Sequence, residues 1–183
     1  MTLVIGPAHE QELAAVGELT LEAYAADGFV TPEADYAQDL LDAATRAHEA
    51  ELYVARDEGG TLLGTVTYCP EGSSYRELAG AGEGEFRMLA VAPNARGRGV
   101  AEALVSLCLE RSVELGYSAV VLSSMSLQEQ AHRLYTRLGF RRTPELDWKP
   151  IPSVELQAFR LDLRPAPGRR AVPGTVPGPR PRG

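Results

Sequence analysis

The sequence predicts a single α/β domain that contains a mixed, mostly antiparallel sheet of about seven strands with helices on both faces. Two observations support this fold class. Segments with the apolar pattern of strands are interleaved with segments of helical apolar spacing. One strand–helix–strand unit, residues 85–124, requires a right-handed parallel crossover at the centre of the sheet, whereas hairpin signals around it favour antiparallel pairs. The length of 183 residues suits one such domain.

The N-terminal part of the chain predicts a strand, two helices and a hairpin. Residues 2–5 form a short apolar run. Apolar residues then keep helical spacing through residues 8–26, and again through residues 33–47. Two further apolar runs within residues 51–69 are predicted strands, and Asp57–Gly60 between them is a hairpin signal.

The rest of the domain alternates strands with helices. Gly116 and Gly139 stand where the two predicted helices should stop. In the second of these helices, the spacing predicts that Leu127, Ala131 and Leu134 face the core. In order, the expected elements are a flexible glycine-rich loop at 71–84, a strand at 85–91, a helix at 98–115, a strand at 118–124, a helix at 127–138, and strands at 140–143 and 153–163.

Composition sets limits on function. The net charge is −7 and every acidic residue precedes residue 164, so we expect no nucleic-acid partner. No apolar run is long enough to span a membrane and the first residues resemble no signal peptide, which together predict a cytoplasmic protein. Two cysteines and three scattered histidines suggest no metal site. Residues 164–183 are rich in Pro, Gly and Arg and are predicted to be a disordered tail behind a domain at 1–163.

The stretch Arg96-Gly97-Arg98-Gly99-Val100-Ala101 lies between a predicted strand and a predicted helix. Backbone N–H groups at a helix start lack partners within the helix, and glycines let an anion approach them closely. The helix dipole and the arginines add positive potential. The stretch therefore favours phosphate binding, with a plain glycine-rich turn as the alternative. It is neither a Walker A loop nor a dinucleotide fingerprint.

These residues resemble the acetyl-CoA loop of the GNAT superfamily of N-acetyltransferases, whose pattern is Q/R-x-x-G-x-G/A. The resemblance extends to "FRMLAVAP" at 86–93, "SAVVLSS" at 118–124 and "AHRLYTRLGFRR" at 131–142, and covers residues 2 to about 163. It implies a GNAT-like fold and an enzyme that transfers acetyl from acetyl-CoA to a primary amine, with a small-molecule amine favoured. A non-catalytic acyl-CoA sensor and an acetyltransferase of protein N-termini or lysines remain alternatives, as do a monomer and a homodimer.

The resemblance also implies roles for particular residues in binding the coenzyme. The amides of Arg96 to Ala101 would hold its pyrophosphate. The pantetheine arm would lie beside Leu89, Ala90 and Val91, and a backbone N–H near Val91 would polarise the thioester carbonyl. Gln128 stands where the family often has an Asn that contacts the arm.

Two residues are the expected catalytic groups. Tyr135 matches the family tyrosine that protonates the departing thiolate, with a packing role as the alternative. Glu85 is the candidate base for the amine, with a solvated glutamate paired to Arg87 as the alternative. By strand alternation Glu85 should share a face with Arg87, Leu89 and Val91.

In the family, two loops shape the acceptor pocket, and they correspond here to residues 24–36 and 144–153. Their side chains predict an amine with an apolar or aromatic part. If Glu85 is not the base, Asp27 and Asp147 are the next candidates. The aromatic residues of these loops are Tyr24, Phe29, Tyr36 and Trp148, and the acids are Asp27, Glu33, Asp35, Glu145 and Asp147.

Overall fold

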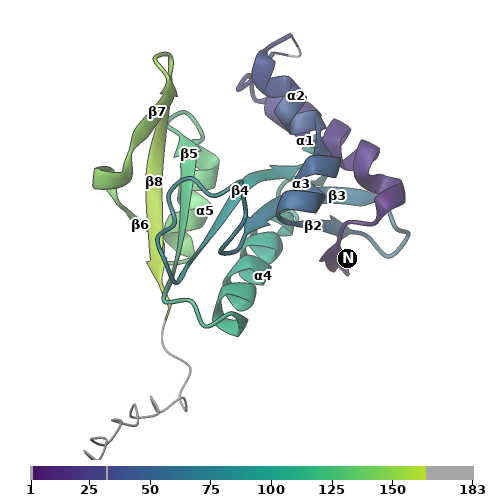
Figure 1. Cartoon of the computed structure of the whole chain (residues 1–183). Helices are drawn as coiled ribbons and strands as arrows, with labels where there is room; N and C mark the ends of the chain where they lie inside the picture. The colour runs from purple at the N-terminus through teal and green to yellow at the C-terminus, as the bar shows by residue number, and fades with distance from the viewer. Residues whose placement is uncertain (1, 32, 164–183) are drawn as a thin grey trace, which may run out of the picture.

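The computed structural model describes residues 2–31 and 33–163, which form one eight-stranded sheet with helices on both faces (Figure 1). The strand order is β1-β2-β3-β4-β5-β8-β6, and β7 pairs with β8. The predicted tail, residues 164–183, lies outside the described residues. The strands are β1 (Val4–Pro7), β2 (Glu51–Arg56), β3 (Leu62–Cys69), β4 (Glu83–Val91), β5 (Ala119–Met125), β6 (Arg141–Arg142), β7 (Trp148–Ile151) and β8 (Val154–Asp162).

Five α-helices and three short 3₁₀ turns connect these strands in the described residues. The helices are α1 (Leu13–Ala26), α2 (Asp35–Leu41), α3 (Ala43–Glu49), α4 (Val100–Glu114) and α5 (Glu129–Arg137). The turns are η1 (Glu10–Glu12), η2 (Pro93–Ala95) and η3 (Pro144–Leu146).

The predicted fold class is confirmed. Among the pairs that the described strands make, β4 with β5 is parallel and the others are antiparallel, and α4 makes the crossover between β4 and β5. The sheet has one strand more than expected, because residues 148–151 pair with β8 as β7. Pro150 weakened the strand signal there, and proline is tolerated in a strand at a sheet edge.

Three local predictions differ from the structure. The helix expected at 33–47 breaks at Asp42, whose side chain accepts a hydrogen bond from the Thr45 N–H at 2.9 Å and so begins α3. Leu127 was expected in the core but is 78% exposed, because α5 starts only at Glu129. The loop before β4, expected to be flexible, is bound to the carboxylate of Glu85, as described below.

The core forms two layers, one on each face of the sheet. On one face, α4 and α5 cover the largest apolar cluster, which includes Leu104, Cys108, Leu134 and Phe159. On the other face, α1, α2 and α3 pack over smaller clusters. The sheet therefore separates two compartments, and only an interruption of its hydrogen bonding can connect them.

That interruption lies between β4 and β5. Their parallel pairing covers Glu83 to Glu85 against Ala119 to Val121 and goes no further in the described residues. Beyond this point β5 pairs with β8 and β4 with β3, and the two strands diverge (Figure 1). The β4 edge from residue 86 to residue 91 is thus left open toward β5.

A β-bulge lies just beyond the end of this pairing. The register of β4 against β3 slips by one residue, so that Met88 and Leu89 stand opposite Val66 alone. Met88, one of the two bulged residues, has a φ of 50°, a conformation that residues other than glycine rarely adopt.

The bulge reverses which side of the sheet each later residue faces. Leu89 and Val91 pack with the α4 cluster, whereas Met88 and Ala90 pack against α1 and α2. The expectation that Leu89 and Val91 share a face with Glu85 is therefore wrong, because strict alternation holds only along an unbroken strand.

The crossing of α1 and α2 gives a stability prediction. A Cβ atom at Gly17 would overlap the backbone carbonyl of Leu41. We expect Gly17→Ala to lower the free energy of unfolding by about 1–3 kcal/mol, because the two helices must separate. Gly6→Ala, where a Cβ meets nothing within 4 Å, is the matched control. Urea unfolding of both variants checks this, and equal stability of Gly17→Ala and the parent would contradict the close crossing.

Candidate active site

The glycine-arginine loop has the geometry of an anion site. Gly97 and Gly99 adopt positive φ, 72° and 78°, which glycine tolerates without strain. Gly99 is the N-cap of α4, so the loop ends at a helix N-terminus with its unsatisfied N–H groups and positive dipole end. Val100 is buried beneath the first turn and Ala101 packs beside the same cluster, while Arg98 is exposed. Such a loop can hold phosphate groups on its backbone.

Arg96 fastens this loop to α1. Its guanidinium donates to both carboxylate oxygens of Asp27, at 2.7 and 3.0 Å, and to the carbonyl oxygen of Ala23 at 3.2 Å. Both charged side chains are more than a third exposed, so the pair adds at most about 1 kcal/mol to stability. The ion pair instead holds the loop in position against the C-terminal end of α1. Asp27, expected in an acceptor loop, is thus a partner of the anion loop.

Beside this loop, the open edge of β4 carries Leu89, Ala90 and Val91, which the sequence assigned to the coenzyme arm. Ala90 and Val91 pair with β3 on their other side. Backbone groups that point away from β3 have no strand partner there in the described residues. They can therefore bind an extended ligand as an added strand would bind.

Tyr135 lies on α5 in the larger core, in ring contact with Phe86, Phe140 and Phe159. It is 4% exposed, and its hydroxyl has no hydrogen bond to any part of the chain that the structure describes. Burial raises the pKa of Tyr135 well above its usual range, so the phenol stays protonated. Burial also raises the pKa of Tyr24 on α1, and the nearby phenol of Tyr135 adds to this. Tyr135 belongs to the core on the α4–α5 face of the sheet, and Tyr24 packs on the α1–α3 face.

Gln128 begins α5 and closes the end of β5. Its Oε1 accepts hydrogen bonds from the Ser124 hydroxyl at 2.7 Å and from the Met125 N–H at 3.0 Å. The side-chain oxygen is therefore committed within the chain, and the amide nitrogen is the group that remains to meet a ligand.

Glu85 is placed differently from a surface carboxylate. Its side chain is fully buried, and Oε2 accepts three backbone N–H groups, from Glu77, Leu78 and Ala79, at 2.9 to 3.0 Å. Oε1 has no hydrogen-bond partner. The alternative partner Arg87 forms its ion pair with Glu77 and not with Glu85. Glu85 instead anchors the loop that joins β3 to β4.

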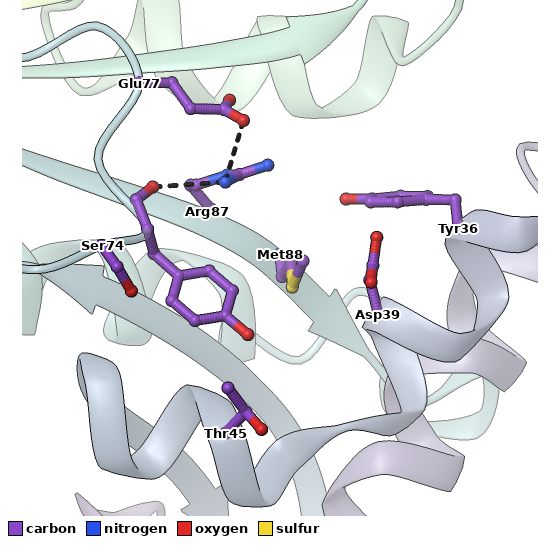
Figure 2. A pocket seen from close by; sticks show the side chains of 8 residues that line it. Tyr36, Asp39, Thr45, Ser74, Glu77, Arg87 and Met88 are labelled. Atoms are coloured by element: carbon purple, nitrogen blue, oxygen red, sulfur yellow. Dashed lines mark hydrogen bonds and ion pairs between the residues drawn. The ribbon is translucent and has the colours of Figure 1, made fainter.

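That anchored loop forms one wall of a pocket of about 380 Å³ on the α1–α3 face (Figure 2). This volume lies at the low end of the range for small-molecule sites. Arg87 and Met88, next to the bulge, form its floor, so the pocket adjoins the opening between β4 and β5. The lining residues are Tyr36, Asp39, Thr45, Ser74, Tyr75, Glu77, Arg87 and Met88.

Glu77 and Arg87 form an ion pair in this pocket. Arg87 Nη1 lies 3.0 Å from Glu77 Oε1 and donates to the Tyr75 carbonyl oxygen at 3.2 Å. Glu77 Oε2 and Arg87 Nη2 have no hydrogen-bond partner among the described residues, and Figure 2 shows Arg87 pointing toward Tyr36 across the pocket. Burial raises the pKa of Glu77, the charge of Glu85 adds to this, and Arg87 opposes it. A carboxylate of raised pKa is a stronger base.

Sequence reasoning missed Glu77, because it lies in a loop that looked flexible. Of the expected acceptor-loop residues, Tyr36 lines the pocket, and Tyr24 packs edge-on against Tyr36 with ring centroids 6.4 Å apart. Asp147 does not line the pocket. It binds the Arg142 guanidinium at 2.7 and 2.9 Å and accepts the Ala158 N–H at 2.8 Å, which fixes η3 against β8.

No group of three or more His, Cys, Asp or Glu side chains within residues 2–31 and 33–163 is arranged to hold a metal ion. None of the helices in that part of the chain has the length and apolar character needed to cross a membrane.

A sequence profile of the acetyltransferase (GNAT) family matches residues 15–140. The chain belongs to this family. The match includes the anion loop, the opened strands and Tyr135, so the site described above lies inside the region that the family shares.

Solved structures of the GNAT fold resemble the chain over nearly its whole length. An acetyltransferase of the GNAT family from Staphylococcus aureus Mu50 superposes with a TM-score of 0.71 at 13% identity, covering 89% of this chain and 100% of that one. The yncA protein of Salmonella typhimurium, solved with its cofactor acetyl-CoA, superposes with a TM-score of 0.63 at 20% identity, covering 96% and 100%. At these identities the likeness concerns the fold.

Curated relatives share shorter segments with this GNAT chain. An uncharacterized N-acetyltransferase of Schizosaccharomyces pombe is 39% identical over 103 residues, which is 56% of this chain and 59% of that protein. The N-acetylaspartate synthetase of Danio rerio is 39% identical over 70 residues, 38% of this chain and 25% of that protein. The chain thus spans between a quarter and about three fifths of the length of these two relatives.

Glu85 gives a prediction that separates its two possible roles. Glu85→Gln keeps the shape but removes the charge that binds three amides, and it buries an amide nitrogen where Oε1 had no partner. We expect a loss of about 1–3 kcal/mol in the free energy of unfolding, and faster hydrogen exchange at residues 77–79. Glu71→Gln, an exposed substitution in the same loop, is the control. If Glu85 is instead the base, turnover by Glu85→Gln should recover as pH rises, with stability unchanged.

Proposed function

We propose that this protein is an acetyl-CoA-dependent N-acetyltransferase that acts on the primary amine of a small molecule. One observation carries the proposal: the open edge of β4 runs from the pocket floor at Arg87 and Met88 to Val91, and the anion loop follows β4 in the chain. A donor bound along the loop and the open edge would meet an acceptor bound in the pocket.

Acetyl-CoA suits the donor side of this site. The loop from Arg96 to Ala101 supplies backbone donors and a helix N-terminus for the pyrophosphate. The open edge at Leu89, Ala90 and Val91 supplies backbone groups for the amide-containing arm, with the Gln128 amide nitrogen as a further donor. An N–H of this edge near Val91 would stabilise negative charge on the thioester oxygen.

A small acceptor suits the other side. The pocket is walled by α2, α3 and the anchored loop, which restricts its size to about 380 Å³. The N-acetylaspartate synthetases among the relatives bear names that imply a small acceptor, and this supports the same class here.

The proposed reaction is direct transfer. The ammonium group of the acceptor gives a proton to Glu77, and the free amine attacks the thioester carbonyl carbon. The carbon–sulfur bond breaks, and the thiolate takes a proton from the phenol of Tyr135. As the carbon–sulfur bond breaks, the nitrogen loses its second proton to water, and the proton on Glu77 passes through water to the Tyr135 phenolate. The products are the acetamide, free coenzyme A and one proton. Glu77 takes the role that the sequence analysis gave to Glu85, since Glu77 faces the pocket.

The principal test combines binding with turnover. Acetyl-CoA should raise the melting temperature, since a ligand that binds only the native state must do so. Free thiol should then be released with members of a panel of small amines. Gly97→Val combined with Gly99→Val should abolish both effects, because β-branched residues resist positive φ. Gly28→Val, also at positive φ but outside the loop, controls for strain alone. Stabilisation without thiol release from any amine or peptide would support the acyl-CoA sensor instead.

The base can be tested through pH. With Glu77 as base, kcat/KM should rise as pH increases through the raised pKa of Glu77, since only the carboxylate accepts a proton. Glu77→Gln should lower kcat/KM at pH 7 by about 10²- to 10⁴-fold, with recovery toward the pKa of the amine itself. Glu77→Asp should retain part of the activity, and Glu71→Gln all of it. A parent-like profile for Glu77→Gln would exclude it as the base.

A further inference from the structure

The charges around the acceptor pocket define the acceptor more closely than its size does. We infer that the acceptor is an aminocarboxylate, a molecule that carries a carboxylate on or next to the carbon that bears its amine, as free amino acids do. This inference rests on the proposed function and concerns which amines the same site selects.

The Glu77–Arg87 ion pair is the first observation. The two side chains lie in contact in the pocket, and each keeps one polar atom, Oε2 or Nη2, without a partner in the described part of the chain. The ammonium and carboxylate groups of an amino acid also carry opposite charges and lie close together. An amino acid bound beside the ion pair can place its ammonium group against Glu77 and its carboxylate group against Arg87. Both contacts are charge-assisted, and a guanidinium is well shaped to bind a carboxylate.

The second observation is a buried cation behind the pocket. Arg46 on α3 is fully buried, and its guanidinium donates to the Thr67 hydroxyl, the Thr20 hydroxyl and the Leu40 carbonyl oxygen at 2.9 to 3.2 Å. These acceptors are neutral, its Nε has no hydrogen-bond partner, and no carboxylate pairs with it within residues 2–31 and 33–163. A buried charge without an opposite charge is costly.

Arg46 is electrostatically connected to the pocket. Its neighbour Thr45 lines the pocket, and so do Tyr75 and Tyr36, whose phenols are close enough for their charge to affect the pKa of Arg46. Burial is the main effect on that pKa and lowers it. The carboxylate of Asp42 raises the pKa of Arg46 without forming an ion pair with it, and a carboxylate bound in the pocket would add a second negative charge near Arg46.

The pocket presents charges of both signs, which a simple amine or a diamine would meet only in part. Asp39 and Glu77 of the lining attract a cation, whereas Arg87 in the floor and Arg46 behind it attract an anion. A ligand that carries one positive and one negative charge meets both sets. The hydroxyl groups of Thr45 and Ser74 already donate to Asp42 and Glu49, so their oxygens remain as acceptors for such a ligand.

The test compares matched acceptors at saturating acetyl-CoA. Each amino acid is paired with the amine that lacks only its carboxylate: leucine with isopentylamine, phenylalanine with phenethylamine, and alanine with ethylamine. For the pairs that turn over, kcat/KM should be about 10- to 100-fold higher for the amino acid, the range expected for a charge-assisted hydrogen bond. Equal rates for acid and amine would overturn the inference while leaving the proposed function intact.

Variants connect the preference to the named residues. Arg87→Gln should lower kcat/KM for the amino acids by more than for the matched amines, so that the preference narrows, because only the amino acids lose a carboxylate contact. Arg87→Lys should keep part of the preference, and Arg133→Gln, on the exposed side of α5, should keep all of it. An unchanged preference in Arg87→Gln would overturn the assignment.

Direct binding covers the case in which no acceptor turns over and the proposed function fails. Calorimetry should then detect the amino acids binding to the parent more tightly than the matched amines, with the difference lost in Arg87→Gln. Absence of amino-acid binding, or equal binding of acid and amine, would overturn the inference independently of catalysis.

Discussion

The arrangement of this molecule depends on one constraint in the sheet: β4 pairs with β3 along its length but with β5 over only three residue pairs. A continuous sheet would separate the layer under α4 and α5 from the layer under α1, α2 and α3. The opening interrupts this separation, and among the described residues it leaves the β4 backbone groups from residue 86 to residue 91 without strand partners on the β5 side. The bulge at Met88 and Leu89 then reverses the alternation of side chains along β4, so that Leu89 and Val91 face the opposite side of the sheet from Glu85.

Electrostatics on the acceptor side follow from the burial of Glu85. A carboxylate in the core requires strong hydrogen bonds, and the nearest donors are the amides of a loop that has few apolar anchors of its own. The three hydrogen bonds to Glu85 hold the loop in place. Glu77 then lies in the pocket, in contact with Arg87. Burial raises the pKa of Glu77 and the negative charge of Glu85 adds to this, so Glu85 fixes the position of Glu77 and contributes to its proton affinity.

Local patterns in the sequence were sufficient for the fold class and for the turn that precedes α4. Residue type predicts the positive φ of Gly97 and Gly99, and apolar spacing predicts the helix that follows them. The acceptor side was not predictable in the same way. Nothing in the residues around Glu77 distinguishes a bound loop from a free one, because its anchor, Glu85, acts through space. The bulge at Met88 likewise has no glycine or proline to mark it, and strict alternation therefore assigned Leu89 and Val91 to the wrong face.

The clamp between Arg96 and Asp27 has a consequence for how the protein reaches its native state. It joins residues that are 69 positions apart in the chain, and Arg46 joins Thr20 and Thr67 across separations of 26 and 21. Contacts of such long range form only after the intervening chain has been organised, and closing large loops slows their formation. The strand–helix unit with the anion loop can assemble from nearby residues, whereas the α1–α3 layer must dock on it afterwards. Partly folded chains would thus carry a formed anion loop before the pocket on the α1–α3 face is complete.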